Sequence, residues 1–301
     1  MFRRKIADMS VTIRRFLLSI LGLLAGLAAW PITELALAYQ EIFPSYFVFS
    51  ITLGTIFGLI MGGFFGSGQG IGTADREKFK AGMITGAVVG VIGGVVGFLI
   101  GQGALFIVGE IFVSNKSFST VGFPISRSVG WGFLGLFIGS IEGIRTQSPR
   151  LVGVGLTGGL LGGILGGLAV EYLNLIFTSM IFTRLIGLLI LGLLIGFFYG
   201  LVEHRLSFGV LKILNGKYKG KEYLINRRRT RIGSGKKADI LLGPYEKVND
   251  LHAELRIKGD EVILRGLAPD TPVSVNDDQI SEQQLKYDDV IRIGTAKFIY
   301  L

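Results

Sequence analysis

The sequence contains no cysteine, which excludes disulfide bonds, thiolate zinc sites and a cysteine nucleophile. It has only two histidines, His204 and His252, and no spacing of His, Asp or Glu that is typical of a metal site. It also lacks a Walker loop, and neither Ser67 nor Ser234 lies in the Gly-x-Ser-x-Gly context of a hydrolase. We therefore expect no enzymatic activity, no metal and no cofactor.

Charged residues are scarce, at 18% of 301 residues, whereas hydrophobic residues make up 50%. An ordinary soluble domain has about 25% charged residues, so this composition is typical of a membrane protein. Of the 46 glycines, 37 lie before Leu206. The sequence predicts an N-terminal segment at 1–15, a membrane domain at 16–203, a linker at 204–209 and a soluble domain at 210–301.

The net charge of +9 is divided almost evenly, with +5 before residue 207 and +4 after it. So modest a surplus in each part does not indicate a nucleic-acid partner. It fits loops and a domain that lie beside anionic lipid. We expect the bilayer and a protein to be the partners of this chain.

Six apolar segments precede residue 206, and each can supply the residues that a spanning helix needs, the fourth only barely. They lie at 16–38, 46–66, 81–112, 129–144, 151–177 and 185–203. Lys and Arg are concentrated before the first segment and in alternate loops, at Arg3, Arg4, Lys5, Arg14, Arg15, Arg76, Lys78, Lys80, Arg145 and Arg150. This bias predicts that both termini are cytoplasmic, at an inner or plasma membrane.

The first segment has an alternative reading as a signal peptide. It follows a basic region, and Ala36-Leu37-Ala38 resembles a cleavage site. The apolar run is long for a signal peptide, so we favour a retained first helix. Cleavage would leave the topology of the later helices unchanged.

Glycine recurs at four-residue spacing in a pattern that indicates an internal repeat. The even-numbered segments share the runs Gly58-Gly62-Gly66, Gly135-Gly139-Gly143 and Gly192-Gly196-Gly200. The third and fifth segments share, at a constant offset of 73, Gly82, Gly86, Gly90, Gly93 and Gly94 with Gly155, Gly159, Gly163, Gly166 and Gly167. We interpret the membrane domain as three related helical hairpins, the first diverged, that pack through glycine stripes. A three-fold pseudo-symmetric channel, carrier or lipid-handling protein is the alternative.

Four glutamates lie within or beside the apolar segments, where charge is costly and often functional. Glu142 lies three residues before Arg145, so the two can pair at the cytoplasmic edge. Glu34, Glu110 and Glu171 fall near the opposite ends of their helices. Placement at the interface explains them, and a hypothesis that they converge on a cation site stays open.

After residue 206 the pattern changes to nine short runs rich in Val, Ile, Leu and Tyr, separated by turn residues such as Asn215-Gly216. This spacing predicts an all-β sandwich. The motifs Thr230-Arg-Ile-Gly233-Ser-Gly, Val248-Asn-Asp-Leu-His252 and Val273-Ser-Val-Asn276, in this order, resemble those of forkhead-associated (FHA) domains over about 207–301. The resemblance implies phosphothreonine recognition by loops at one end of the sandwich, with Gly233, His252 and Asn276 as scaffold residues.

The positions that the family uses for phosphate are altered. Ser234 stands where the family usually has Arg, Asn249 replaces its Ser three residues before the motif His, and Thr271-Pro272 replaces its Asn-Gly pair. Lys236 and Lys237 lie in the same loop and could supply charge, although Lys lacks the bidentate fork of Arg. The sequence leaves three roles open for Ser234, Lys236, Lys237, Asn249 and Thr271: phosphothreonine binding, a phosphate-independent protein surface, or a structural part of the module.

A run of arginines lies before and within the first FHA motif, at Arg227, Arg228, Arg229 and Arg231. It fits either a contribution to phosphate binding or a basic face that lies on the cytoplasmic leaflet. From the whole chain we predict a membrane-anchored regulatory or scaffold protein whose cytoplasmic FHA-like domain binds a protein partner.

Overall fold

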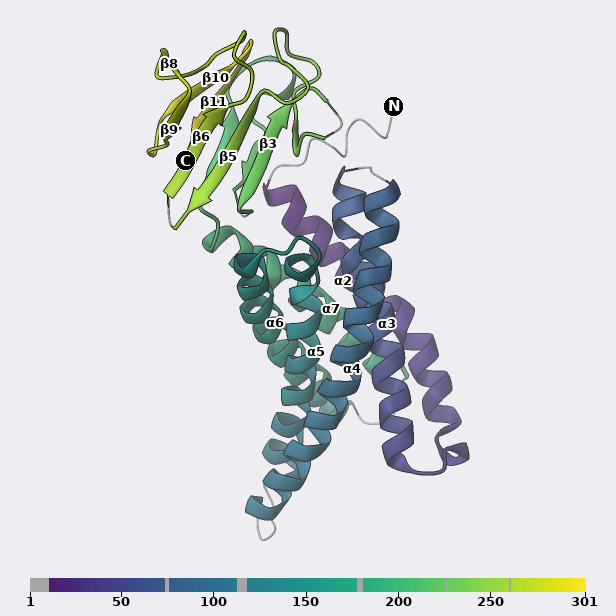
Figure 1. Ribbon diagram of the computed structural model, residues 1–301. Helices are drawn as coiled ribbons and strands as arrows, with labels where there is room; N and C mark the ends of the chain where they lie inside the picture. Colours follow the sequence, from purple (N-terminus) through teal and green to yellow (C-terminus); the bar gives the residue numbers. More distant parts are fainter. Residues whose placement is uncertain are drawn as a thin grey trace. The chain divides into compact units, whose positions relative to one another are not determined.

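The computed structural model describes residues 11–73, 76–112, 118–177, 181–225, 227–235, 237–259 and 261–301. The N-terminal segment at 1–10, Lys116 and Lys236 lie outside the described residues. The chain divides into a helical unit that ends at Glu203 and a β unit that begins at His204 (Figure 1). The predicted layout, a six-helix membrane domain followed by an all-β sandwich, is confirmed.

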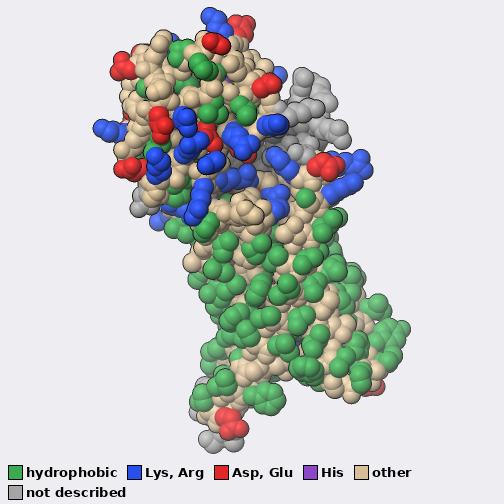
Figure 2. All heavy atoms as spheres, viewed as in Figure 1, with side chains coloured by type: hydrophobic (Ala, Val, Ile, Leu, Met, Phe, Trp, Pro, Cys, Tyr) green, Lys and Arg blue, Asp and Glu red, His purple; other side chains and the backbone are tan. Residues whose placement is uncertain are grey.

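The helical unit contains six helices that are long and apolar enough to span a membrane. They are α2 (Val11–Ala38), α3 (Tyr46–Thr73), α4 (Arg76–Phe112), α5 (Phe123–Arg145), α6 (Pro149–Ile176) and α7 (Ile181–Arg205). Hydrophobic side chains cover the face of this unit that Figure 2 shows. The exposed hydrophobic residues of the unit include Ile84, Phe106 and Ile144. A surface of this kind is stable only in lipid or detergent.

The fourth span begins earlier than the sequence predicts. A π-helical turn at Phe118–Gly122 leads directly into α5, so the apolar helix starts about ten residues before the predicted 129–144. Ser126 and Ser128 interrupt the apolar pattern, but their hydroxyls donate to the carbonyls of Gly122 and Pro124, at 2.7 and 2.6 Å. Because these polar groups are satisfied inside the helix, they can be buried in it.

Glycines bring the helix backbones into direct contact. A Cβ atom added at Gly58, Gly62 or Gly66 would run into the backbone of Gly90, Gly86 or Gly82 across α3 and α4. The run in α5 meets α6 in the same way, at Gly135 and Gly159, Gly139 and Gly155, and Gly143 and Val152. In α7, Gly192 and Gly196 meet Gly22 and Leu18 of α2. The glycine run of each even-numbered span thus contacts the span that follows it, and the sixth contacts the first.

Other glycines of the third and fifth spans lie at these and further interfaces. Gly94 faces Gly54 of α3, and Gly163 and Gly167 lie against Trp131 of α5. Trp131 also forms an aromatic cluster with Phe57 and Phe98, with ring centroids 5.3 to 6.0 Å apart. This cluster and the buried Met61 and Leu191 form the bundle core.

The acidic side chains of the bundle do not converge. Glu34 pairs with Arg184 at 2.6 Å, and Glu171 lies 3.5 Å from Arg127 and accepts from the Trp131 indole at 3.3 Å. Glu110 is exposed. Within the described ranges no group of three or more His, Asp or Glu could hold a metal ion, so the structure does not bring together the cation site suggested for these glutamates.

The predicted pair at the edge of α5 is confirmed. Arg145 Nη2 lies 3.0 and 2.9 Å from the two carboxylate oxygens of Glu142.

The β unit is a sandwich of two sheets (Figure 1). Its strands are β1 (Val210–Ile213), β2 (Glu222–Leu224), β3 (Arg229–Gly233), β4 (Ile240–Leu241), β5 (Ala253–Lys258), β6 (Glu261–Gly266), β7 (Val273–Val275), β8 (Asp278–Ile280), β9 (Glu282–Gln284), β10 (Val290–Ile293) and β11 (Ala296–Tyr300). One sheet has the order β2-β1-β11-β10-β7-β8 and the other β4-β3-β5-β6-β9.

The inward residues of both sheets form one core, in which Ile213, Ile232, Leu264 and Phe298 are fully buried. Their outward neighbours are mostly polar, which is the alternation that defines a half-buried strand. The linker is fixed to this core from Phe208 onward, because the Tyr300 hydroxyl donates to the Phe208 carbonyl at 2.6 Å. Burial raises the pKa of the Tyr300 hydroxyl, and the neighbouring Tyr287 adds to that shift.

Candidate functional site

Three loops meet at one end of the sandwich: 234–239 between β3 and β4, 242–252 between β4 and β5, and 267–272 between β6 and β7. The first two are joined by main-chain bonds, since the Ser234 N–H donates to the Asn249 carbonyl at 2.9 Å and the Gly235 N–H donates to that of Asp250 at 3.1 Å. These loops carry Ser234, Asn249 and Thr271, which stand at the positions that the FHA family uses for its ligand, and Lys237, which could supply charge.

Gly233 and Ser234 allow these two loops to pack closely against each other. A Cβ atom at Gly233 would collide with the carbonyl of Asp250, so only glycine fits there. The Ser234 hydroxyl donates to the Val248 carbonyl at 3.0 Å. Ser234, at the position where the resemblance predicts a phosphate contact, therefore directs its hydroxyl proton into the scaffold.

His252 is fully buried beneath the loops. Its Nδ1 accepts from the Asn249 N–H at 3.2 Å, so the neutral ring carries its proton on Nε2. Its carbonyl accepts from the Leu267 N–H at 2.9 Å, which connects the β4–β5 loop to the β6–β7 loop. Burial lowers the pKa of the imidazole, and contact with the Thr271 backbone partly opposes that effect.

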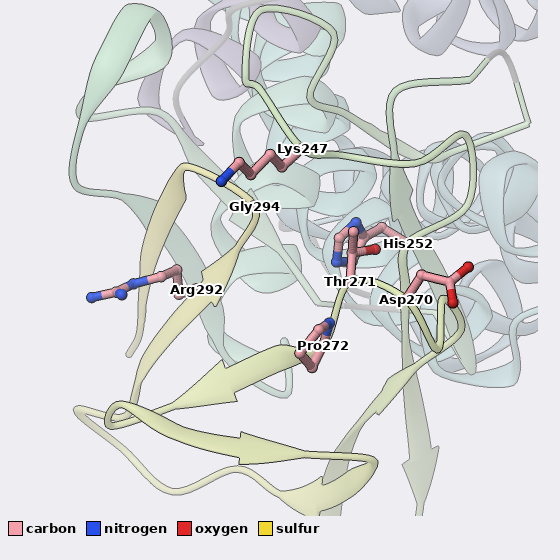
Figure 3. A pocket seen from close by; sticks show the side chains of 7 residues that line it. All are labelled: Lys247, His252, Asp270, Thr271, Pro272, Arg292 and Gly294. Carbon is pink, nitrogen blue, oxygen red and sulfur yellow. The ribbon is translucent and has the colours of Figure 1, made fainter.

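An open pocket of about 240 Å³ lies beside His252. It is lined by Lys247, His252, Asp270, Thr271, Pro272, Arg292 and Gly294 (Figure 3). Thr271 lies against the His252 ring, whereas the Asp270 carboxylate points away from it (Figure 3). Among the described residues, neither Thr271 Oγ1 nor His252 Nε2 has a partner with good hydrogen-bond geometry.

Two of the predicted contact residues remain open to solvent. The side chains of Lys237 and Asn249 are exposed, and no hydrogen bond or ion pair from either side chain is found within the described residues. Thr271 is half-buried. The loops thus present Lys237 and Asn249 outward while Ser234 and His252 hold the loops in place.

Asn276 lies away from these loops, in the turn between β7 and β8. Its φ of +51° is in the left-handed region, which asparagine tolerates well. Its side chain donates to Asp289 at 2.8 Å and accepts from the Val290 N–H at 2.9 Å. Asn276 therefore ties this turn to the start of β10.

Sequence reasoning missed Lys247, Asp270 and Arg292, which line the pocket. Lys247 has a φ of +56°, and Gly294, with a φ of +57°, packs against the carbonyls of Glu246 and Lys247. No motif marks these positions, because the β10–β11 turn and the β4–β5 loop meet only in the folded sandwich.

Comparisons with known proteins identify the β unit alone. Residues 212–300 match the family model described as the cytoplasmic domain of the inner membrane component of T3SS. No curated protein matches the chain. The helical unit lies outside these matches.

Several solved FHA domains are similar to the β unit. The FhaA FHA domain, solved in complex with the intracellular domain of Rv3910, is 30% identical over 31% of this chain and 99% of that chain, with a TM-score of 0.29. An FHA domain from a study of phosphothreonine-dependent FHA interactions is 30% identical over 31% of this chain and 93% of that one, with a TM-score of 0.28. The FHA domain of CT664 from Chlamydia trachomatis is 26% identical over 31% and 95%, with a TM-score of 0.29.

Proposed function

Residues 210–301 are an FHA-like domain carried by a six-helix membrane protein, and from this premise we propose that the domain recruits a protein partner to the inner membrane. The binding surface is the loop end that exposes Lys237 and Asn249. The observation that carries the proposal is the fixed position of these loops. The Ser234 hydroxyl bonds to the Val248 carbonyl, and the His252 ring accepts from the Asn249 N–H. A preorganised loop surface loses less entropy on binding than a flexible one.

The membrane topology supports a cytoplasmic partner. The matched family is a cytoplasmic domain of an inner membrane component, and the Lys and Arg of alternate loops favour both termini inside. Arg127 and Arg184 are the exceptions to this bias among the described loops and helix ends, and each pairs with a glutamate. Their charge therefore weighs little against the proposed orientation.

The partner in this proposal is bound without phosphate. Phosphate recognition needs charge-assisted donors, most effectively the bidentate Arg. Ser234 occupies that position and its hydroxyl donates to Val248, and Asn249 replaces the family's Ser. The acidic Asp250 and Asp270 lie in the same loops, which makes the site less favourable for a dianion.

We assign the bundle the role of an anchor and propose no enzymatic activity. The glycine stripes face backbone at Gly58, Gly90, Gly135 and Gly159, so the atoms that would line a path pack against one another. The glutamates that would bind a cation either pair with arginine or lie exposed. These contacts support close packing of the helices over transport.

A photo-crosslinking experiment tests partner binding. The full chain carries a genetically encoded benzoyl-phenylalanine at Asn249, or at the exposed Gln279 of β8 as the matched control position. We expect a discrete protein adduct at position 249 in intact cells and none at 279. The substitution Lys237→Ala should lower the yield of this adduct at least threefold. Its control, Lys297→Ala on β11, should leave the yield unchanged.

Phosphatase treatment of the membranes before irradiation tests whether partner binding depends on phosphate. The adduct at position 249 should persist undiminished, since no phosphate contact contributes. Loss of the adduct would overturn phosphate independence, and the absence of any adduct at 249 would overturn recruitment through this end.

A further inference from the structure

The outer face of the five-stranded sheet carries a second charged surface, separate from the loops. Arg229 and Arg231 of β3 are exposed while Thr230 and Ile232 point into the core. Across the ladder, Arg256 and Lys258 of β5 lie on the same outer side. We call Arg229, Arg231, Arg256 and Lys258 the basic face, and Figure 2 shows Lys and Arg side chains gathered on this domain.

Two carboxylates lie beside this charge on β5 and β6, Glu254 and Glu261, and Glu261 is directly opposite Lys258. Glu254 is almost fully buried on the outer side of β5, where Arg231 and Arg265 are its neighbours on the flanking strands. It is bonded to Arg256, with Nε to Oε2 at 2.6 Å. Glu254 thus pairs with Arg256, and neither Arg229 nor Arg231 has an ion pair within the described residues.

The ladder adds a like-charge contact. Arg229 is the direct cross-strand partner of Arg256, and like charges directly opposite on a sheet are destabilising. Arg228, immediately before β3, is also exposed and extends the charge beyond the strand. An external anion would relieve this repulsion, whereas water and salt relieve it only partly.

Arginines elsewhere in the domain are paired, as Arg256 is, and this distinguishes Arg229 and Arg231 from them. Arg265 lies 4.0 Å from Glu282, and Arg292 lies 2.9 Å from Asp277. Arg227 lies 3.5 Å from Asp239, and that aspartate also accepts from the Arg231 N–H at 3.0 Å. The surplus is therefore local to the β3–β5 side of the sheet.

We propose that the basic face docks on the anionic phospholipid headgroups of the membrane that anchors the chain. Only residues 206–209 separate the end of α7 from the start of β1, so the tether holds the domain at a high effective concentration of lipid. Anionic headgroups supply the negative charge that this face lacks, and each Arg or Lys near such a surface contributes about 1 kcal/mol. This role goes beyond partner recruitment and uses different residues.

Fluorescence quenching in vesicles tests the proposal on the full chain. Because the sequence has no cysteine, Ile263→Cys places a single fluorophore on β6, opposite Arg256 on the outer face. Gln279→Cys on β8 of the other sheet is the control position. The vesicles contain nitroxide-labelled lipid in phosphatidylcholine, with or without phosphatidylglycerol.

We expect strong quenching at position 263 only with phosphatidylglycerol, reversed by salt, and little quenching at 279. The pair Arg229→Gln and Arg231→Gln should lower the ratio of docked to undocked domain about 30-fold, from two charges at about 1 kcal/mol each. The matched pair Arg292→Gln and Lys297→Gln removes the same charge from β10 and β11 of the other sheet and should lower the ratio less than threefold. A thermal-unfolding midpoint no lower than that of the parent shows that the fold of each variant is intact.

Equal quenching at 263 in both lipid compositions would overturn the proposal, as would equal losses for the two pairs of variants. If the face instead binds an acidic protein, quenching will not depend on phosphatidylglycerol, and a photo-crosslinker at Ile263 will give a protein adduct that the Arg229 and Arg231 substitutions abolish. Either result leaves recruitment through Asn249 and Lys237 standing, because that test reads the other surface.

Discussion

Arg184 forms a bidentate ion pair with Glu34, with Nε to Oε1 at 2.6 Å and Nη2 to Oε2 at 2.9 Å, although 150 residues separate the two in the chain. The pair joins the last helix, α7, to the first, α2. The same two helices meet backbone to backbone where Gly22 faces Gly192. An ion pair and a glycine contact therefore connect the two ends of the membrane domain.

Breaking this pair should loosen the first helix. Glu34→Gln leaves the guanidinium of a partly exposed pair without its charge partner, which costs about 1–2 kcal/mol. We expect a lower thermal-unfolding midpoint for the solubilised full chain, and partial recovery in the swap Glu34→Arg with Arg184→Glu. Glu41→Gln, at an exposed position, is the control and should leave the midpoint unchanged.

The glycine contacts predict a sharp difference between two alanine substitutions. At Gly58 a Cβ would meet the carbonyl of Gly90, so Gly58→Ala must push α3 and α4 apart. We expect a loss of about 1–3 kcal/mol in unfolding free energy, the usual cost of overpacking. Gly109→Ala on α4 meets nothing within 4 Å and should be neutral or stabilising by up to about 1 kcal/mol. Equal effects at both sites would show that the stripe plays no part in packing.

His252 should make the β unit sensitive to acid. Burial lowers the pKa of its imidazole below the ordinary value of 6.5, so the unfolded chain binds the proton more readily than the folded one. The stability that the neutral ring contributes is complete above about pH 6.5 and is lost as the pH falls toward the lowered pKa. The protection factors for hydrogen exchange in β5 and the 242–252 loop of the full chain, which are corrected for the slower intrinsic exchange at lower pH, should therefore fall between pH 7 and pH 5.

His252→Gln is the variant that checks this assignment. Its side-chain oxygen can still accept from the Asn249 N–H but does not titrate, so the pH dependence between pH 7 and pH 5 should flatten. His204→Gln, which removes the other histidine of the sequence, should leave that dependence in place. The reverse pattern would show that the pH dependence does not come from His252 in the loop scaffold.

Much of the fold could be predicted because strong local patterns determine it. Runs of about 20 apolar residues predict spans, and alternating runs with Gly233 and His252 at fixed spacing predict the FHA-like sandwich. The sequence did not predict β8 and β9, because Asp278, Gln279 and Glu282 lie on edge strands with little apolar alternation. The start of the fourth span was also not predicted, because Ser126 and Ser128 interrupt its apolar pattern.

The site was harder to predict because its contacts are not local. The spacing of the motifs could indicate which loops meet, but not that the Ser234 hydroxyl would donate to Val248. Nor could it show that Lys247 and Arg292 would flank a pocket, since their segments are far apart in the sequence. The convergence suggested for Glu34 and Glu171 failed because each has its own arginine, and pairing of that kind depends on helix placement.

The altered phosphate positions lead to a gain-of-function prediction. Ser234→Arg with Asn249→Ser supplies, on a loop scaffold that already exists, a guanidinium fork and a hydroxyl where the FHA resemblance places them. The Ser234 bond to Val248 is lost, at a cost of about 1 kcal/mol, but the main-chain bonds of Ser234 and Gly235 to the next loop remain. The β3–β4 and β4–β5 loops should therefore stay in contact in the double variant.

The measurement compares the solubilised parent and double variant for binding to a degenerate peptide library built around one phosphothreonine and to its unphosphorylated counterpart. We expect no preference in the parent and at least a tenfold preference for the phosphorylated library in the variant, since a charge-assisted bond contributes about 1.5–3 kcal/mol. The control Lys297→Arg with Gln279→Ser, which introduces the same two residue types on β11 and β8, should show no such preference. A parent that already prefers the phosphorylated library would instead mean that Lys237 or another cation at the loop end substitutes for the missing Arg, and the proposal of phosphate-independent binding would have to be abandoned.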